Sequence, residues 1–160
     1  MYIDSPVVMC YNSSSVTLHF HSQEKTAMKI TEISIKNFRS FDERGVSIVV
    51  GEMTAFVGKN SSGKSNILQA LQLFWGQYAL AAEDFYYGET DRTISVSVTF
   101  AVAPDEILPV LLPYVSPDGF LQLRHDYTEV DLKGKLYSCG KNEYTGQPEM
   151  NPFPERKLKL

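Results

Sequence analysis

The sequence predicts an α/β fold in which a strand, a glycine-rich loop and a helix are joined to an antiparallel β arm. Three observations support this fold class. A short apolar run at 54–57 leads into the segment Gly-Lys-Asn-Ser-Ser-Gly-Lys-Ser at 58–65. Apolar residues then recur at helical spacing between Ile67 and Phe74. Over 94–102, apolar side chains alternate with small ones, which is the pattern of a half-buried antiparallel strand.

The segment 58–65 fits the pattern of a phosphate-binding loop, in which a glycine and four further residues precede Gly-Lys-Ser. Gly58 and Gly63 let the chain curl, so that the intervening amides point toward phosphate oxygens. The helix that begins near Gly63 adds unpaired amides and the positive end of its dipole. Lys64 is expected to reach the β- and γ-phosphates and the Ser65 hydroxyl to ligate Mg²⁺, which predicts ATP with Mg²⁺ as cofactors. The alternative is a Gly- and Ser-rich turn before an ordinary helix.

Length and composition set the limits within which the motif is interpreted. A chain of 160 residues suits one domain, and 43% hydrophobic with 21% charged residues is ordinary for a globular protein. The net charge of −4 makes no overall electrostatic case for nucleic acid or an anionic membrane. We expect a cytoplasmic protein with no membrane partner, because no run of about 18 apolar residues occurs. Cys10 and Cys139 lack metal-ligand spacing and are expected to be free thiols.

Ahead of the loop, the pattern predicts a loose extension and then antiparallel strands. Residues 1–27 are expected to be a loosely ordered N-terminal extension, and the ordered domain is expected to begin at Met28. Strands are predicted at about 30–38 and 46–50, on either side of a polar bend. A third strand at 53–57 is expected to feed the loop.

Behind the loop, a helix is predicted to run from Lys64 to about Trp75, with Gly76 as its stop and 77–82 as a candidate extension. Polar and aromatic residues at 83–91 predict a loop, which leads into the strand at 94–102.

Farther on, Pro104 and the acids after it predict a short helix that ends before Pro113. A strand is predicted from Phe120, and a hairpin is predicted from Val130, Leu132 and Leu136 around a turn at 133–134. Glycines and prolines over 138–160 predict an irregular C-terminal tail.

Two asparagines extend the motif to Gly-x-Asn-x-x-Gly-Lys-Ser-Asn: Asn60 lies two positions after the first glycine, and Asn66 directly follows Ser65. The stretch from Met28 through Ile-Lys-Asn-Phe-Arg-Ser-Phe at 35–41 completes the pattern. Together these residues resemble ABC-type ATPases of the SMC and RecF class, and within it the N-terminal part of OLD-family ATPases. The resemblance covers residues 28 to about 137. It implies the N-terminal lobe of a P-loop NTPase over 28–137, a partial ABC-ATPase head.

The resemblance also implies the residues that hold nucleotide. These are Gly58, Asn60, Ser61, Ser62, Gly63, Lys64, Ser65, Asn66 and Arg39. For Arg39 two interpretations stay open, contact with a phosphate or the base and a solvated position in the hairpin bend. The family pattern implies a homodimer of the complete protein with ATP between its subunits. It implies a DNA partner, and in OLD proteins a Toprim nuclease domain, for the complete protein alone.

Some elements of the family pattern do not appear. Hydrolysis in this class needs an Asp-Glu pair after four apolar residues. The nearest candidate, 101–106, follows an alternating strand and contains a proline, so we do not assign it. The family's signature motif is a Ser-Gly-Gly segment that opens a helix, and residues 145–147 resemble it weakly. Pro148 follows directly and argues against a regular helix there, so the segment is not assigned. No catalytic residue is therefore predicted, and the chain is expected to be part of a larger ATPase.

Two other functions use the same loop. A small-molecule kinase has a similar length, but here 57 residues precede the loop and only five arginines are available to clamp a transferring phosphoryl group. A remnant that binds nucleotide without turnover is the other alternative.

Overall fold

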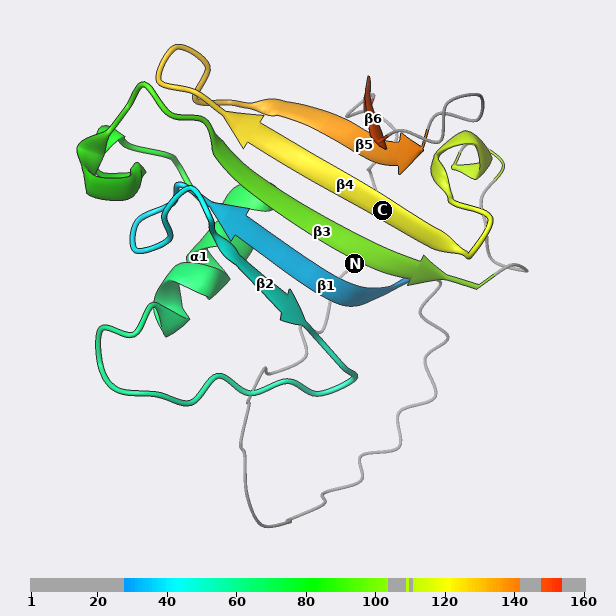
Figure 1. Ribbon diagram of the computed structural model, residues 1–160, viewed down its shortest axis with the longest axis horizontal. Helices are drawn as coiled ribbons and strands as arrows, with labels where there is room; N and C mark the ends of the chain where they lie inside the picture. The colour runs from blue at the N-terminus through cyan, green and yellow to red at the C-terminus, as the bar shows by residue number, and fades with distance from the viewer. Residues whose placement is uncertain (1–27, 104–108, 110, 142–147, 154–160) are drawn as a thin grey trace.

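The computed structural model describes residues 28–103, 109, 111–141 and 148–153. These residues form one antiparallel sheet of six strands in the order β2-β1-β3-β4-β5-β6, with the helix α1 behind one face (Figure 1). The strands are β1 (Met28–Lys36), β2 (Val46–Val49), β3 (Ile94–Val102), β4 (Phe120–Tyr127), β5 (Lys135–Lys141) and β6 (Pro148–Pro152). The helices are α1 (Lys64–Phe74) and the short 3-10 turns η1 (Ala82–Asp84), η2 (Tyr86–Gly88) and η4 (Leu112–Tyr114).

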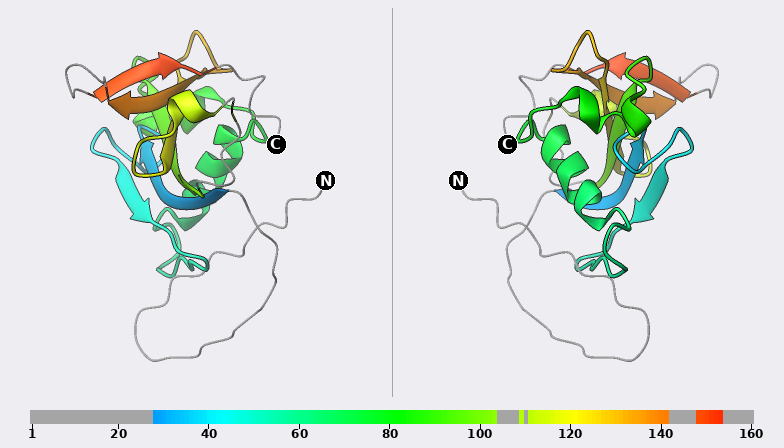
Figure 2. Two further views of the ribbon diagram at one scale, coloured as in Figure 1. Left: turned by 90° about the vertical axis from the view of Figure 1, so that its right-hand side faces the viewer. Right: turned by 90° about the vertical axis from the view of Figure 1, so that its left-hand side faces the viewer.

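The strand β3 lies at the centre of the sheet because every second side chain on it is apolar. Val98 is opposite Ile33 on β1 and Leu123 on β4, and all three side chains are buried. The predicted alternation over 94–102 is therefore confirmed. The apolar face packs against the helix, whose buried residues are Ile67, Ala70, Leu73 and Phe74. Figure 2 shows α1 on this one face only.

Strand β4 holds the C-terminal end of α1. The buried Tyr127 hydroxyl donates a hydrogen bond to the Leu73 carbonyl at 2.8 Å. The helix ends at Phe74, and Gly76 just beyond its cap has a φ of 67°, a conformation that glycine adopts without a Cβ clash. The helical bounds agree with the prediction, but 77–82 does not prolong the helix. This hydrogen bond fixes the C-terminal end of α1 to the sheet. The loop 58–63 lies at the opposite, N-terminal end of the helix.

The expected strand at 53–57 is not formed. Ala55 makes an isolated β-bridge, and Val57 is 66% exposed immediately before the loop. A strand exists only where neighbouring backbones supply hydrogen bonds, and the described residues supply no ladder at this segment. The local apolar run was therefore a correct sign of burial at Thr54 and Ala55, but not of a completed strand.

The C-terminal half contains more sheet than the sequence predicted. The hairpin joins β4 to β5, and the residues 128–134 form its loop rather than a strand. Val130 is 97% exposed there. The expected irregular chain from 138 onward is wrong where the structure describes it, because β5 runs through 138–141 and pairs with β6. Gly134 permits the tight return, since a Cβ on it would lie 2.5 Å from the Tyr127 ring.

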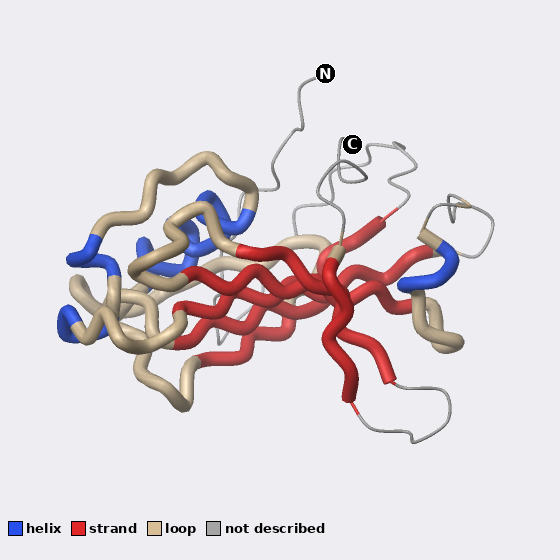
Figure 3. Tube along the Cα trace, turned by 90° about the horizontal axis from the view of Figure 1, so that it is seen from above, coloured by secondary structure: helices blue, strands red, loops and turns tan. Residues whose placement is uncertain are grey.

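Several expectations fall outside the described residues. They concern the extension 1–27 with Cys10, the start of the helix at 104–106 and the segment 145–147. The predicted helix was expected to end before Pro113, but the 3-10 turn η4 (Leu112–Tyr114) includes this proline. Seen from above, α1, η1 and η2 gather at one end of the sheet and η4 lies at the other (Figure 3).

Candidate phosphate-binding site

The loop 58–63 opens directly onto the N-terminal end of α1. Gly63 is the cap residue, with φ 85° and ψ 2°, and no side chain caps this end of the helix. An α-helix leaves its first amides without partners inside the helix, and they carry the positive end of the dipole. The residues 57–62 are exposed. The end of α1 is therefore accessible to an anion.

Lys64 places its ammonium group inside the curl of the loop. Its Nζ donates hydrogen bonds to the carbonyl oxygens of Gly58 at 2.7 Å and Lys59 at 2.6 Å, and to the Ser62 hydroxyl at 3.2 Å. The loop thus wraps around one positive charge, which lies beside the open helix end. A fixed cation next to unpaired amides is the arrangement that binds phosphate oxygens.

Two positions in the loop depend on close backbone approach. A Cβ on Gly58 would lie 2.9 Å from the Ser62 hydroxyl oxygen. A Cβ on Gly63 would lie 2.9 Å from the Ser40 hydroxyl oxygen and 3.3 Å from the Phe41 ring. Ser61 also takes a left-handed conformation, with φ 68°. The two glycines of the motif are therefore explained by contacts in this structure.

The bend that follows β1 runs along α1 toward the loop. Arg39 bonds to Gln69, Ser40 accepts a hydrogen bond from the Asn66 amide at 2.8 Å, and Phe41 lies against Gly63. Successive residues of the bend thus contact positions 69, 66 and 63, which lie about one helical turn apart toward the start of α1. The bend forms one wall of the loop, and Asn66 binds this wall. Ser40, Phe41 and Gln69 were not predicted as site residues, because nothing in their local pattern shows which helix face they meet.

Arg39 does not occupy a solvated position in the hairpin bend, which was one of its two predicted roles. Its Nε donates to Asp84 at 2.7 Å, and its other two nitrogens donate to Gln69 at 2.5 Å and to the Tyr78 hydroxyl at 2.7 Å. The guanidinium also lies over the rings of Phe38 and Tyr78. Its side chain is 29% exposed and that of Asp84 is buried. A nucleotide contact by Arg39 stays a prediction.

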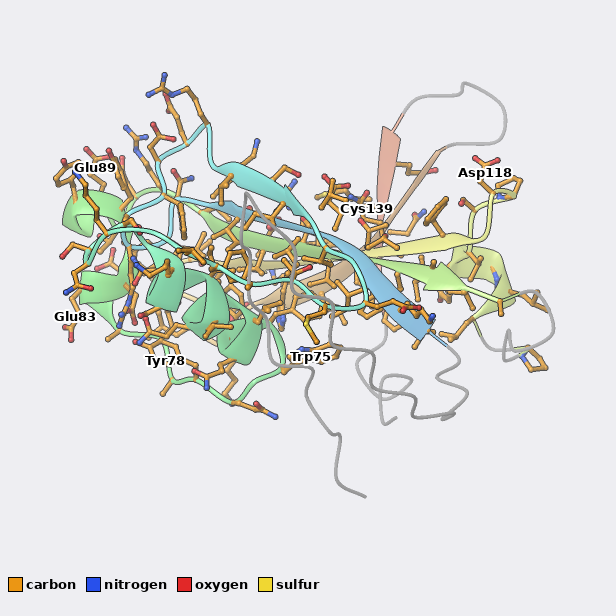
Figure 4. All side chains as sticks on the ribbon, turned by 90° about the horizontal axis from the view of Figure 1, so that it is seen from below. Trp75, Tyr78, Glu83, Glu89, Asp118 and Cys139 are labelled. Carbon is orange, nitrogen blue, oxygen red and sulfur yellow. The ribbon has the colours of Figure 1, made fainter. Side chains whose placement is uncertain are left out.

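The surroundings of Arg39 and Tyr78 raise the pKa of both side chains. Burial alone would lower the pKa of Arg39, but the hydrogen bond and charge of Asp84 raise it on balance. Burial, followed by the hydrogen bond and charge of Asp84, raises the pKa of Tyr78 above its ordinary value. Arg39 is thus charged and Tyr78 is a neutral donor near neutral pH. Figure 4 shows Tyr78 beside α1.

The chain offers one of the ligands that a magnesium ion needs. Ser65 lies exposed in the first turn of α1, where its hydroxyl is available. Among the residues that the structure describes, no group of three His, Cys, Asp or Glu side chains could hold a metal ion. Mg²⁺ usually takes one or two protein ligands together with phosphate oxygens and water. A single hydroxyl therefore fits a Mg²⁺ ion that arrives with a nucleotide.

The chain is similar to several known proteins and to one protein family. The AAA ATPase domain family matches residues 28–155. The chromosome partition protein Smc of Lactiplantibacillus plantarum is 31% identical over 121 residues, which are 73% of this chain and 10% of that protein. The OLD nuclease of Thermus scotoductus is 32% identical over 77 residues, which are 44% of this chain and 14% of that protein. The chain thus spans about a tenth of the Smc relative it matches.

A solved structure has the same fold. It comes from work on ATP-driven dimerization and DNA-stimulated activation of SMC ATPases, and it matches with a TM-score of 0.52 at 18% identity. The match covers 80% of this chain and 74% of that one. In the part of this chain that the structure describes, no helix is long and apolar enough to cross a membrane. The chain therefore belongs to the AAA ATPase domain family, as an SMC- and RecF-like member of these nucleotide-binding P-loop ATPases.

Proposed function

We propose that this chain is the ATP-binding front lobe of a larger SMC- or RecF-like ATPase. The observation that carries the proposal is the position of Lys64, whose ammonium group lies inside the loop beside an uncapped helix end. The β- and γ-phosphates of ATP would replace the loop oxygens that now accept hydrogen bonds from this ammonium group, and they would bind the amides of 60–65. The Ser65 hydroxyl would ligate the accompanying Mg²⁺, and the remaining ligands would be phosphate oxygens, water and a carboxylate from outside this lobe.

The unfinished segment at 53–57 supports the idea of a second lobe. Met53 and Val57 are 64% and 66% exposed, although both belong to the apolar run that leads into the loop. An apolar run of this kind is typical of a strand that is buried on both faces. We propose that strands from another part of the ATPase, or from a second polypeptide, pair with 53–57. That lobe would also bring the Asp-Glu pair that hydrolysis needs.

The activity of the whole protein is proposed from its relatives. The solved structure comes from work on ATP-driven dimerization and DNA-stimulated activation. By analogy, two completed heads of this protein would enclose ATP as a homodimer and act on DNA. The similarity to an OLD nuclease makes a DNA-acting ATPase and nuclease the specific candidate.

The arrangement of arginines disfavours a small-molecule kinase. Each arginine in the described ranges already pairs with a carboxylate. These arginines are Arg39, Arg44, Arg92 and Arg124. A kinase needs several arginines free to clamp the transferring phosphoryl group. A lobe that binds nucleotide without turnover is the second candidate, because no catalytic carboxylate is identified among the residues that the structure describes.

Titration of the full chain with ATP and Mg²⁺ by calorimetry tests the proposal. We expect binding that Lys64→Ala weakens by about tenfold to a hundredfold, because hydrogen bonds to a charged group contribute ~1.5–3 kcal/mol. Lys59→Ala is the matched control, because Lys59 meets the ammonium group through its backbone carbonyl, which this variant keeps. Equal affinity in the parent and Lys64→Ala would contradict the proposal. Transfer of phosphate to an added acceptor would instead favour a kinase.

A further inference from the structure

We propose that Asp84 is a positioning residue for the phosphate-binding loop, which it shapes through Arg39 without touching the nucleotide. The inference rests on the proposed function, since it names a further residue that supports the same site. Asp84 lies in η1, twenty positions beyond Lys64, and belongs to no phosphate-loop motif. Its buried carboxylate is explained by none of the roles given so far.

The carboxylate is the centre of a fully used set of hydrogen bonds. Its Oδ1 accepts from Arg39 Nε at 2.7 Å and from the Tyr78 hydroxyl at 2.9 Å. Its Oδ2 accepts from the Ala81 amide at 2.9 Å. The Asp84 backbone carbonyl accepts from the Arg39 amide at 2.7 Å. Asp84 therefore holds both the backbone and the guanidinium of Arg39.

Arg39 needs this support because its own backbone is strained. Its φ is 50°, in the left-handed region that side chains other than glycine rarely adopt. Such a conformation persists where surrounding contacts over-determine it. The ion pair, the backbone hydrogen bond from its amide and the bond to Gln69 on α1 supply those contacts.

The position of Arg39 then sets the wall of the loop. Ser40 and Phe41 follow it directly and meet Asn66 and Gly63 at the start of α1. If the carboxylate is lost, the strained bend is free to relax, and the two residues after it shift away from the helix. The loop around Lys64 then loses the contacts that Ser40 and Phe41 make beside Gly63. Nucleotide affinity should fall, although Asp84 itself contacts only protein groups.

The experiment compares Asp84→Asn with Leu121→Ala in the full chain. Asn keeps the size of the side chain but loses the charge that pairs with Arg39. Leu121 is buried in β4 opposite Phe100, so its truncation destabilises the fold from a different part of the sheet. Amide hydrogen exchange is measured first, without nucleotide. We expect Asp84→Asn to speed amide exchange at 39–41 and 63–67 more than in β1. In Leu121→Ala, any increase in exchange at 39–41 and 63–67 should be no larger than the increase in β1.

Nucleotide affinity is measured next, at a temperature where all variants are folded. We expect Asp84→Asn to weaken binding of ATP with Mg²⁺ on the order of tenfold, the size of loss seen when supporting residues are removed at metal sites. Leu121→Ala should leave the affinity near that of the parent. In an Arg39→Ala background, Asp84→Asn should cause no further loss, because its effect passes through Arg39.

The outcomes separate the two proposals. Unchanged exchange at 39–41 and 63–67 in Asp84→Asn would overturn the positioning role, whether or not the chain binds nucleotide. If the parent binds nucleotide and Lys64→Ala binds it more weakly, an unchanged affinity in Asp84→Asn would also overturn the positioning role and leave the proposed function standing. A parent that binds no nucleotide would overturn the proposed function, and the positioning of the nucleotide site with it.

Discussion

The Nε of Arg39 lies 2.7 Å from the Oδ1 of Asp84, across 45 positions of the chain. This ion pair ties the bend after β1 to η1, and the bend in turn is bonded to the helix that begins at the loop 58–63. Removing the carboxylate leaves the partly buried guanidinium, the Tyr78 hydroxyl and the Ala81 amide without their acceptor, so a pair of this kind is costly to break.

We expect Asp84→Ala to lower the free energy of unfolding by about 3 kcal/mol, because the change removes one partner of a buried ion pair. Urea denaturation measures the loss. Glu52→Ala is the matched control, since Glu52 pairs with Lys29 where both side chains are well exposed. That variant should unfold close to the parent, because an exposed ion pair contributes little to stability. Equal losses in the two variants would show that the buried pair is no stronger than an exposed one.

Gly63→Ala should destabilise the chain more than Gly76→Ala. Both glycines have positive φ values, 85° and 67°, so an added Cβ costs about 1 kcal/mol at each. At Gly63 the Cβ would also meet Ser40 and Phe41, whereas at Gly76 nothing lies within 4 Å. Urea denaturation should separate the variants by a further ~1 kcal/mol or more. Equal unfolding midpoints would contradict the close contact between the bend and the helix cap.

Tyr127→Phe should cost about 1 kcal/mol of stability, because the Leu73 carbonyl at the end of α1 would lose the buried Tyr127 donor and keep only the Gly76 amide. Thermal and urea unfolding both report this change. Tyr87→Phe, at a strongly exposed side chain, is the control and should be close to neutral. If both variants unfold like the parent, β4 does not hold α1 in the way described.

Alkaline pH should weaken the fold through Tyr78. Its pKa is raised in the folded chain by burial, by the hydrogen bond to Asp84 and by the Asp84 charge. A raised pKa means that the folded state favours the neutral phenol. This contribution is complete below the unfolded value near 10 and is lost as pH rises through the folded pKa.

Urea midpoints measured from pH 8 to pH 11 test this dependence. Tyr78→Phe should have a lower midpoint at pH 8, since it loses the hydrogen bond to Asp84, and a shallower decline above pH 10. The same decline in both proteins would assign the alkaline sensitivity to other tyrosines.

Deletion of residues 1–27 should leave the melting temperature close to that of the full chain. The sequence predicts a loose extension there, which contributes little to a core that starts at Met28. Calorimetric scans of both chains measure the difference. A drop of many degrees would mean that the segment packs on the domain.

The sequence by itself determined the position of the glycine-rich loop 58–63 before a helix, the bounds of α1 and the course of β3. Each follows from local spacing: two glycines five positions apart around the loop, a helical repeat after Lys64 and strict alternation over 94–102. Side-chain periodicity is a property of the chain itself, so these elements need no knowledge of their neighbours.

Only the tertiary structure decided what the remaining segments pair with. The apolar run 53–57 has no strand ladder in the described chain, while 138–141 and 148–152, which seemed irregular, form β5 and β6. Strand formation depends on hydrogen bonds from distant residues, which local spacing does not specify. The same holds for Arg39 and Asp84: which charge reaches which partner is set by how the bend, η1 and α1 converge in space.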